Sequence, residues 1–155
     1  MQVIKVKSNE IFPVIVDLLK SGQTARITVT GNSMNPFLKA DRDSVELSKT
    51  SFREIRMGDI VLVKRTNGIY VLHRVCKKTK DSFFMVGDAQ QWIEGPLQPE
   101  QLVAKVISVR RKDREIPCNN IVWGVLSWAW LKLRIFRYKI FRVNALLKKA
   151  IGKVR

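Results

Sequence analysis

Alternation of hydrophobic and polar residues marks a series of short strands along the chain. Residues 25–30 alternate and are rich in β-branched side chains. Five later segments are also extended in character, namely 44–48, 59–64, 69–75, 83–86 and 102–110. Turn residues separate them, and Asn67-Gly68 is typical of a tight hairpin. The pattern predicts a mainly β body with curled antiparallel sheets.

Helical spacing of apolar residues occurs near both ends. Ser8 can cap a short N-terminal helix that runs to about Ser21, where Gly22 can end it. Near the other end, residues 121–131 carry no charge, and apolar residues then recur at three- and four-residue steps among basic side chains. This second pattern predicts a basic amphipathic C-terminal helix.

The change in character over residues 113–120 is the only candidate boundary in the chain. We therefore expect a β-rich domain over residues 1–115 and a Trp-rich, basic helical tail over residues 121–155. No internal repeat or low-complexity linker interrupts this organisation.

The net charge of +16 is concentrated in the tail. All 13 acidic residues lie between Glu10 and Glu115, whereas nine Lys and Arg residues follow Leu131 without one acid among them. This distribution favours an anionic membrane surface, met by residues 131–155, over a nucleic-acid groove. The uncharged stretch of residues 121–131 is shorter than the roughly 20 residues that cross a bilayer. The alternative is a helix that packs on the β body or on a second copy.

The N-terminal residues and the cysteine and histidine content limit which locations and which cofactors the sequence allows. Met1 to Ser8 lacks the apolar core of a signal peptide or membrane span, so we expect peripheral membrane association on the cytoplasmic face. Cys76 and Cys118 have no CxxC spacing, and the chain has one histidine, so no zinc set is expected. We expect no cofactor and no metal.

Candidate chemistry begins at the turn Gly31-Asn32-Ser33-Met34-Asn35-Pro36, which can present the Ser33 hydroxyl. A serine nucleophile needs a base, and His73 is the only histidine. Taken singly, Ser33 fits ordinary turn chemistry and His73 fits a core residue on an apolar strand face. Asp88 and Glu94 follow the next strand, and either could orient an imidazole. Reasoning from the residues ends at a Ser-His-acid hypothesis with the acid undecided.

Four segments together resemble the ordered motif boxes of the type I signal peptidase and signal-peptidase-like serine protease family. They are Gly31 to Pro36, Gly58-Asp59-Ile60-Val61, His73-Arg74-Val75 and Gly87-Asp88-Ala89. The resemblance covers roughly residues 20 to 110, and 40 residues separate Ser33 from His73. It implies the curled β fold of these proteases.

The resemblance also implies roles for the residues. Ser33 would attack the scissile carbonyl, and His73 would act as base, as in the endoplasmic-reticulum and sporulation-type branch, where His replaces the Lys of other members. That branch has an Asp in its Gly-Asp box, matched by Asp88, and a second Asp six residues later, where this chain has Glu94. The orienting acid is therefore Asp88 or Glu94.

Binding roles follow from the same resemblance. The Ser33 N–H would donate to the oxyanion, while Gly31 stands where some members carry a second, hydroxyl donor. Met34 resembles the methionine that lines the substrate pocket, although a core position is the alternative. The substrate would be an extended polypeptide carrying a leader or signal segment.

The sequence thus predicts a Ser-His endopeptidase that removes a leader or signal segment. A second hypothesis is a catalytically silent peptide-binding or regulatory β module. A third, a relative of self-cleaving repressors, is disfavoured because residues 1–24 are too few for a helix-turn-helix domain. We accordingly expect no nucleic-acid partner.

Overall fold

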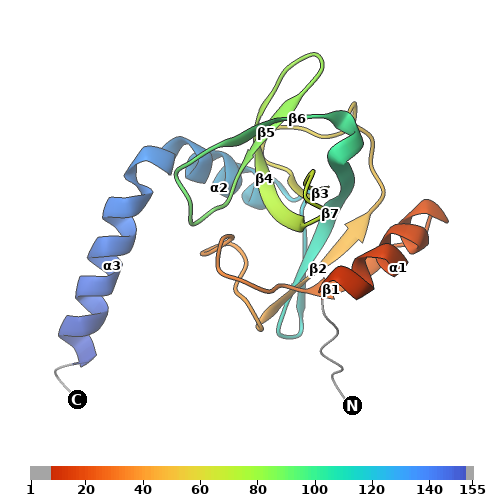
Figure 1. Ribbon diagram of the computed structural model, residues 1–155. Helices are drawn as coiled ribbons and strands as arrows, with labels where there is room; N and C mark the ends of the chain where they lie inside the picture. The colour runs from red at the N-terminus through yellow and green to blue at the C-terminus, as the bar shows by residue number, and fades with distance from the viewer. Residues whose placement is uncertain (1–7, 153–155) are drawn as a thin grey trace.

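The computed structural model describes residues 8–152 (Figure 1). Three α-helices and eight strands follow one another with two short 3₁₀ segments. In chain order they are α1 (Ser8–Lys20), β1 (Ala25–Thr28), β2 (Asp43–Ser48), β3 (Ile60–Lys64), β4 (Tyr70–Lys78), β5 (Phe83–Val86), β6 (Glu94–Leu97), η1 (Pro99–Gln101), β7 (Leu102–Arg111), β8 (Arg114–Pro117), α2 (Ile121–Lys132), η2 (Leu133–Phe136) and α3 (Arg137–Gly152).

The strands form one antiparallel sheet in the order β1-β2-β7-β3-β4-β5-β6, and β8 pairs with β7 beside this path. The predicted antiparallel pairing is confirmed. With helices at both ends of the chain the fold is mixed α/β, so the prediction of a mainly β fold with curled sheets is wrong. Among the described strands, β1 and β6 end the path and do not pair with each other, so the sheet stays open. Pro96 in β6 has no N–H to give a further strand, which suits an edge position.

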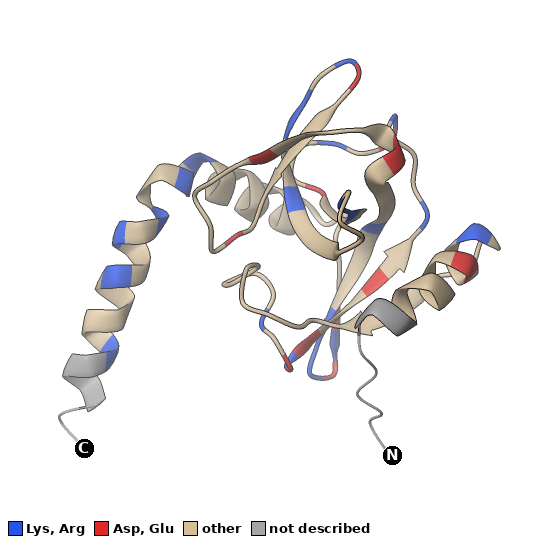
Figure 2. Cartoon of the chain, viewed as in Figure 1, with Lys and Arg blue, Asp and Glu red and all other residues tan. Residues whose placement is uncertain are grey.

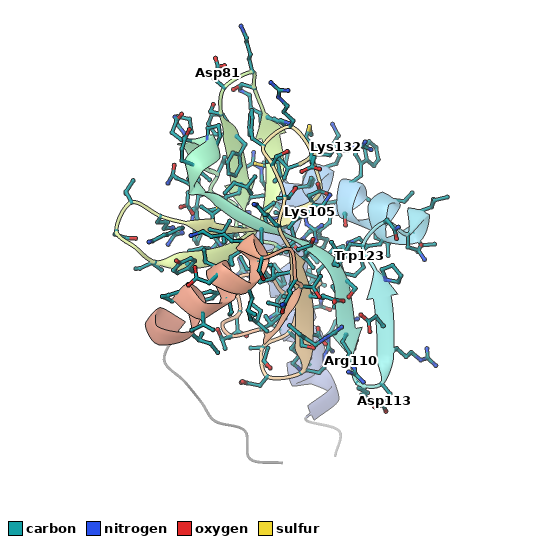
Figure 3. The ribbon with its side chains drawn as sticks, turned by 90° about the vertical axis from the view of Figure 1, so that its right-hand side faces the viewer. Asp81, Lys105, Arg110, Asp113, Trp123 and Lys132 are labelled. Carbon is teal, nitrogen blue, oxygen red and sulfur yellow. The ribbon has the colours of Figure 1, made fainter. Side chains whose placement is uncertain are left out.

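All six predicted strands are present, while β6 and β8 were not predicted. Both contain a proline, Pro96 in β6 and Pro117 in β8, and Gly95 precedes Pro96. Because proline and glycine are typical of turns, the sequence of these segments indicates turns and not strands. β8 lies within the predicted boundary of residues 113–120 and forms a hairpin with β7. Figure 3 shows Asp113 at the tip of this hairpin and Asp81 at the tip of the β4–β5 hairpin, at opposite ends of the molecule.

The predicted N-terminal helix is confirmed as α1. It ends where Gly22 takes a positive φ of 83° and its N–H donates to the Leu19 carbonyl at 3.2 Å. Ile15 and Leu19 are buried against the sheet, and the Phe12 ring stacks on Tyr70 with a centroid distance of 4.4 Å. Apolar burial therefore fixes α1 on the sheet.

The two faces of the sheet bury separate clusters of apolar side chains. The first cluster includes Leu62 of β3 and packs beneath α1. The second includes Val61, the neighbour of Leu62 in the same strand. Because side chains alternate along a strand, residues next to each other in β3 and β4 serve different faces. His73 pairs with Val61 and belongs to the face of the second cluster, whereas Arg74 pairs with Ile60 of the first.

The predicted C-terminal helix is confirmed over α2, η2 and α3. Asn120 caps α2 by accepting a hydrogen bond from the Val122 N–H at 2.8 Å. Trp123, near the start of α2 (Figure 3), meets the Phe37 ring edge-on with centroids 5.4 Å apart. α3 then extends away from the sheet (Figure 1), and the charged residues of its sequence are all basic, which Figure 2 shows as blue segments without red. Residues 153–155 of the predicted membrane-facing segment lie outside the described residues.

Many apolar side chains of this helical segment are exposed. They are Ile121, Val122, Val125, Leu126, Trp128, Leu133, Ile135, Phe136, Tyr138, Val143, Leu146 and Leu147. We call these residues the apolar tail surface. Within residues 8–152, no helix combines the length and apolar character that crossing a bilayer requires.

Candidate active site

The loop that carries Ser33 is held at its base by Asp43. Val29 donates its N–H to the Asp43 carbonyl at 2.9 Å, and the Asp43 carboxylate accepts from the Lys39 N–H at 2.9 Å. Arg42 and Arg111 also donate to this carboxylate. Burial alone would raise the pKa of Asp43, but these hydrogen bonds lower it to about 2. The base of the loop is thus fixed by a carboxylate that stays ionised.

Within the turn, Ser33 is half-buried. Gly31 takes a φ of 79°, a left-handed conformation that favours glycine, and the Asn35 N–H donates to the Asn32 carbonyl at 3.2 Å. Met34 is buried in the first cluster, so it occupies the core position that was the alternative to pocket lining. Among the described residues, the Ser33 N–H donates to no protein acceptor, which leaves it available to an oxyanion.

The turn lies directly against the Gly-Asp box between β5 and β6. The Ala89 N–H donates to the Ser33 carbonyl at 2.8 Å. A Cβ on Gly87 would come within 2.7 Å of the same carbonyl oxygen, so only glycine fits there. Two of the four boxes, far apart in sequence, therefore meet in space.

His73 lies on β4 and is 3% exposed. Its Nδ1 is fully buried and has no hydrogen-bond partner in the described part of the chain. The nearest carboxylate oxygen forming an ion-pair contact is Oε2 of Glu94, 3.8 Å away. That distance is beyond hydrogen-bonding range, and a movement of about 1 Å would satisfy the orphaned nitrogen.

Arg65 controls the charge around this pair. Its Nε donates to Glu94 Oε1 at 2.6 Å, and its Nη2 donates to Oε2 at 2.5 Å. The pKa of His73 is lowered to about 4, first by burial and further by Arg65, while Glu94 acts in the opposite direction. The imidazole is therefore neutral at pH 7 and can accept a proton.

Asp88 is bound elsewhere. Its carboxylate forms two hydrogen bonds with the Arg74 guanidinium, at 2.8 and 2.7 Å, and both side chains are 0% exposed. Arg74 also donates to the Gly58 carbonyl and the Ser127 hydroxyl at 2.8 Å, and it lies 4.5 Å from the Phe37 ring centroid. Of the two candidate acids, the structure places Glu94 beside His73 and pairs Asp88 with Arg74.

The structure thus brings the predicted residues together only in part. Ser33 meets the Gly-Asp box, and His73 meets Glu94, but no hydrogen bond links the Ser33 hydroxyl to the His73 ring within the described chain. Met34 packs in the cluster on the sheet face opposite to that of His73. Ser33 contacts the loop between β5 and β6 through its carbonyl, whereas His73 lies beside Glu94 of β6.

Three charged residues of the site were missed by sequence reasoning. Arg65 binds Glu94, Asp43 fixes the base of the Ser33 loop, and Arg137 of α3 donates to the Gly87 carbonyl of the Gly-Asp box. Arg65 and Asp43 sit among many solvated charges in the sequence and give no distinguishing signal. Arg137 stands among the basic residues of the tail, which the sequence assigns to a membrane surface.

A cavity of about 400 Å³ lies between α2 and the sheet. Its lining includes Cys76, Cys118, Trp123 and Ser127, and neither Ser33 nor His73 belongs to it. In residues 8–152, no three His, Cys, Asp or Glu side chains gather as a metal site requires. No protein-family model matches the chain, and no curated protein is similar to it in sequence.

Proposed function

We propose that this protein is a serine endopeptidase of the signal-peptidase-like type, which cleaves a leader or signal segment from a polypeptide. The observation that carries the proposal is the buried, neutral His73 ring with Glu94 3.8 Å from its otherwise unpartnered Nδ1. An acid on one ring nitrogen selects the tautomer that leaves the other nitrogen free as base. The resemblance of the four boxes assigns the nucleophile to Ser33.

In this proposal each residue has a defined step. His73 takes the proton of the Ser33 hydroxyl as the oxygen attacks the scissile carbonyl, and later returns it to the leaving amine. Glu94 stabilises the imidazolium that forms in between. The unbonded Ser33 N–H donates to the developing oxyanion, and water then releases the acyl group from Ser33.

The two acids can be separated by their contacts. Glu94 lies beside the ring and can accept further hydrogen bonds, since a carboxylate has about four acceptor sites and Arg65 uses two. Asp88 is paired on the opposite side of β4 with Arg74. We therefore assign the orienting role to Glu94 and a structural role to Asp88.

The test uses the full chain and an extended leader peptide with small residues at the cleavage site. Ser33→Ala and His73→Gln should each abolish cleavage, whereas Ser48→Ala, a matched hydroxyl loss on β2, should cleave as the unmodified chain does. A serine-directed phosphonate should label the unmodified chain and Ser48→Ala, but not Ser33→Ala. Cleavage by Ser33→Ala at the unmodified rate would refute the proposal.

A catalytically silent peptide-binding module is the second candidate. Two observations favour it: the Ser33 hydroxyl and His73 share no hydrogen bond in the described chain, and a histidine with a pKa of about 4 is a weak base. Calorimetric binding of the leader peptide, unchanged in Ser33→Ala and without any cleavage, would decide for this candidate.

We also propose that an anionic membrane surface is a partner of the tail. The apolar tail surface is exposed on helices whose charged residues are all basic, a composition that suits the interface of an anionic bilayer. Leu146→Glu should weaken sedimentation with phosphatidylglycerol vesicles. Val14→Glu on α1 is the control, because both side chains are 59% exposed. Equal sedimentation of the two variants would contradict this partner.

A further inference from the structure

The loop of residues 87–91 connects the Ser33 turn to the C-terminal helices. Its Ala89 N–H donates to the Ser33 carbonyl at 2.8 Å. From the other side, Arg137 Nη1 donates to the carbonyls of Gly87 and Gln90, at 2.8 and 2.9 Å. Trp130 Nε1 donates to the Asp88 carbonyl at 2.9 Å. One short loop is therefore held by the tail through its carbonyls and holds the turn through an N–H.

Arg137 carries a buried charge that costs folding free energy and that packing alone does not require. It is 0% exposed, and within residues 8–152 no carboxylate lies in ion-pair range of it. Its Nε is buried without a partner among those residues. A buried charge without a counter-ion destabilises a fold, and an apolar side chain would fill this space without that penalty.

The guanidinium group provides what an apolar side chain cannot. Besides the two loop carbonyls, Arg137 Nη2 donates to the Trp130 carbonyl at 3.0 Å, so one planar group joins the loop to the end of α2. The Arg137 guanidinium carbon also lies 5.2 Å from the Trp130 ring centroid. Arg137 and Trp130 thus form one unit, which we call the tail clamp.

Close packing lets the tail clamp act on Ser33. At Gly87 an added Cβ would lie 2.7 Å from the Ser33 carbonyl oxygen and 2.6 Å from Gln90 Oε1. The loop backbone and the turn are therefore in direct contact, and such close packing transmits a displacement of one to the other. A shift of the loop carbonyls moves the Ala89 N–H, and with it the backbone of the nucleophile.

We propose that Arg137, supported by Trp130, is a positioning residue that sets the Ser33 backbone for attack through the loop of residues 87–91. The effect on cleavage rests on the proposed peptidase function, whereas the mechanical coupling does not. The tail then has a role in the active site that is independent of any membrane. A misplacement of about 1 Å at a nucleophile costs on the order of 100-fold in rate.

The experiment compares Arg137→Met with Arg142→Met. Arg142 is exposed on the same helix, so the control removes the same charge without touching the loop. Arg137→Met should lower kcat on the order of 10- to 100-fold with KM nearly unchanged, because substrate contacts remain. Arg137→Lys, which keeps the charge but loses the planar fork, should fall between the two.

Amide hydrogen exchange tests the coupling without any cleavage assay. In Arg137→Met the Ala89 amide should exchange at least about tenfold faster, while Val45 on strand β2 keeps its rate. Trp130→Phe, which loses one donor and retains an aromatic ring, provides a milder second variant and should accelerate Ala89 to a smaller degree.

The outcomes separate the two proposals. If the Ala89 amide exchanges as slowly in Arg137→Met and Trp130→Phe as in Arg142→Met, the tail clamp is refuted, whatever the activity. Parallel acceleration of Ala89 and Val45 would show general loosening and would also refute it. If Ala89 alone exchanges faster in Arg137→Met and the unmodified chain cleaves no peptide, the coupling is supported and only the peptidase function is refuted.

Discussion

Arg65→Met should raise the pKa of His73. Arg65 binds both oxygens of Glu94, and one of these, Oε2, lies 3.8 Å from His73 Nδ1. The positive charge of Arg65 opposes protonation of the ring directly and also offsets the negative charge of Glu94. Removing it leaves an uncompensated carboxylate beside the imidazole, which favours the charged form.

The size of the shift follows from the charges involved. Two unit charges about 4 Å apart interact by about 4 kcal/mol at an effective dielectric constant of about 20, and one pKa unit corresponds to about 1.4 kcal/mol. Removing Arg65 changes the energy of the charged imidazole by only part of this amount, because the Arg65 side chain is 34% exposed and water screens its charge. We expect the pKa of His73 to rise from about 4 by roughly one to two units.

NMR can measure this pKa directly, because His73 is the only histidine and its imidazole signals need no further assignment. Lys64→Met is the matched control, since Lys64 neighbours Arg65, is exposed and has no contact with Glu94. The acid limb of the cleavage rate should move upward with the ring pKa. If the pKa of His73 in Arg65→Met were equal to or below its value in the unmodified chain, the electrostatic reasoning would be refuted.

Two further predictions concern stability. Asp88→Asn should lower the free energy of unfolding by about 3–5 kcal/mol in urea titrations, because Arg74 would stay buried without its counter-ion. Asp17→Asn, which removes an exposed carboxylate paired with Lys20, should cost less than about 1 kcal/mol, and equal losses would contradict this reasoning. For His73, the unfolded pKa of about 6.5 exceeds the folded value of about 4, so its stabilisation is complete above pH 6.5 and is lost as the pH falls to 4. The loss should be about 3 kcal/mol, and His73→Gln should lack this component; identical pH slopes for both chains would refute it.

Local patterns predicted the elements of the fold better than their arrangement. The strands with alternating β-branched residues and the Asn67-Gly68 hairpin are present, because each depends on neighbours in sequence. Strands β6 and β8 were not predicted because proline and glycine normally interrupt strands, and each forms through pairing with a neighbouring strand, β5 or β7. Whether the sheet closes depends on pairing between distant strands, which no local pattern encodes.

The candidate site shows the same division between local and long-range information. The sequence singled out Ser33 because it lies in a Gly/Asn turn, His73 because it is the only histidine, and Asp88 and Glu94 because they follow the next strand. It could not reveal that Arg137 is buried against the loop of residues 87–91, because basic residues of an amphipathic helix are normally solvated. The tail charges therefore divide into exposed residues and a buried residue that contacts the site.

The alternation of β4 explains why spacing alone left the orienting acid open. His73 and Arg74 are adjacent, so their side chains leave opposite faces of the sheet, and each face meets a different carboxylate. Asp88 reaches Arg74 at the end of β5, whereas the chain returns in β6 to place Glu94 opposite Met85, on the face that carries His73. Six residues of separation in sequence thus become a difference of face. A one-residue register change in β4 would turn every side chain of the strand to the other face, which would take His73 off the face that carries Glu94 and Arg74 off the face that meets Asp88. The pairing of β3 with β4, which the turn at Asn67-Gly68 fixes, therefore determines that Glu94 and not Asp88 lies beside His73.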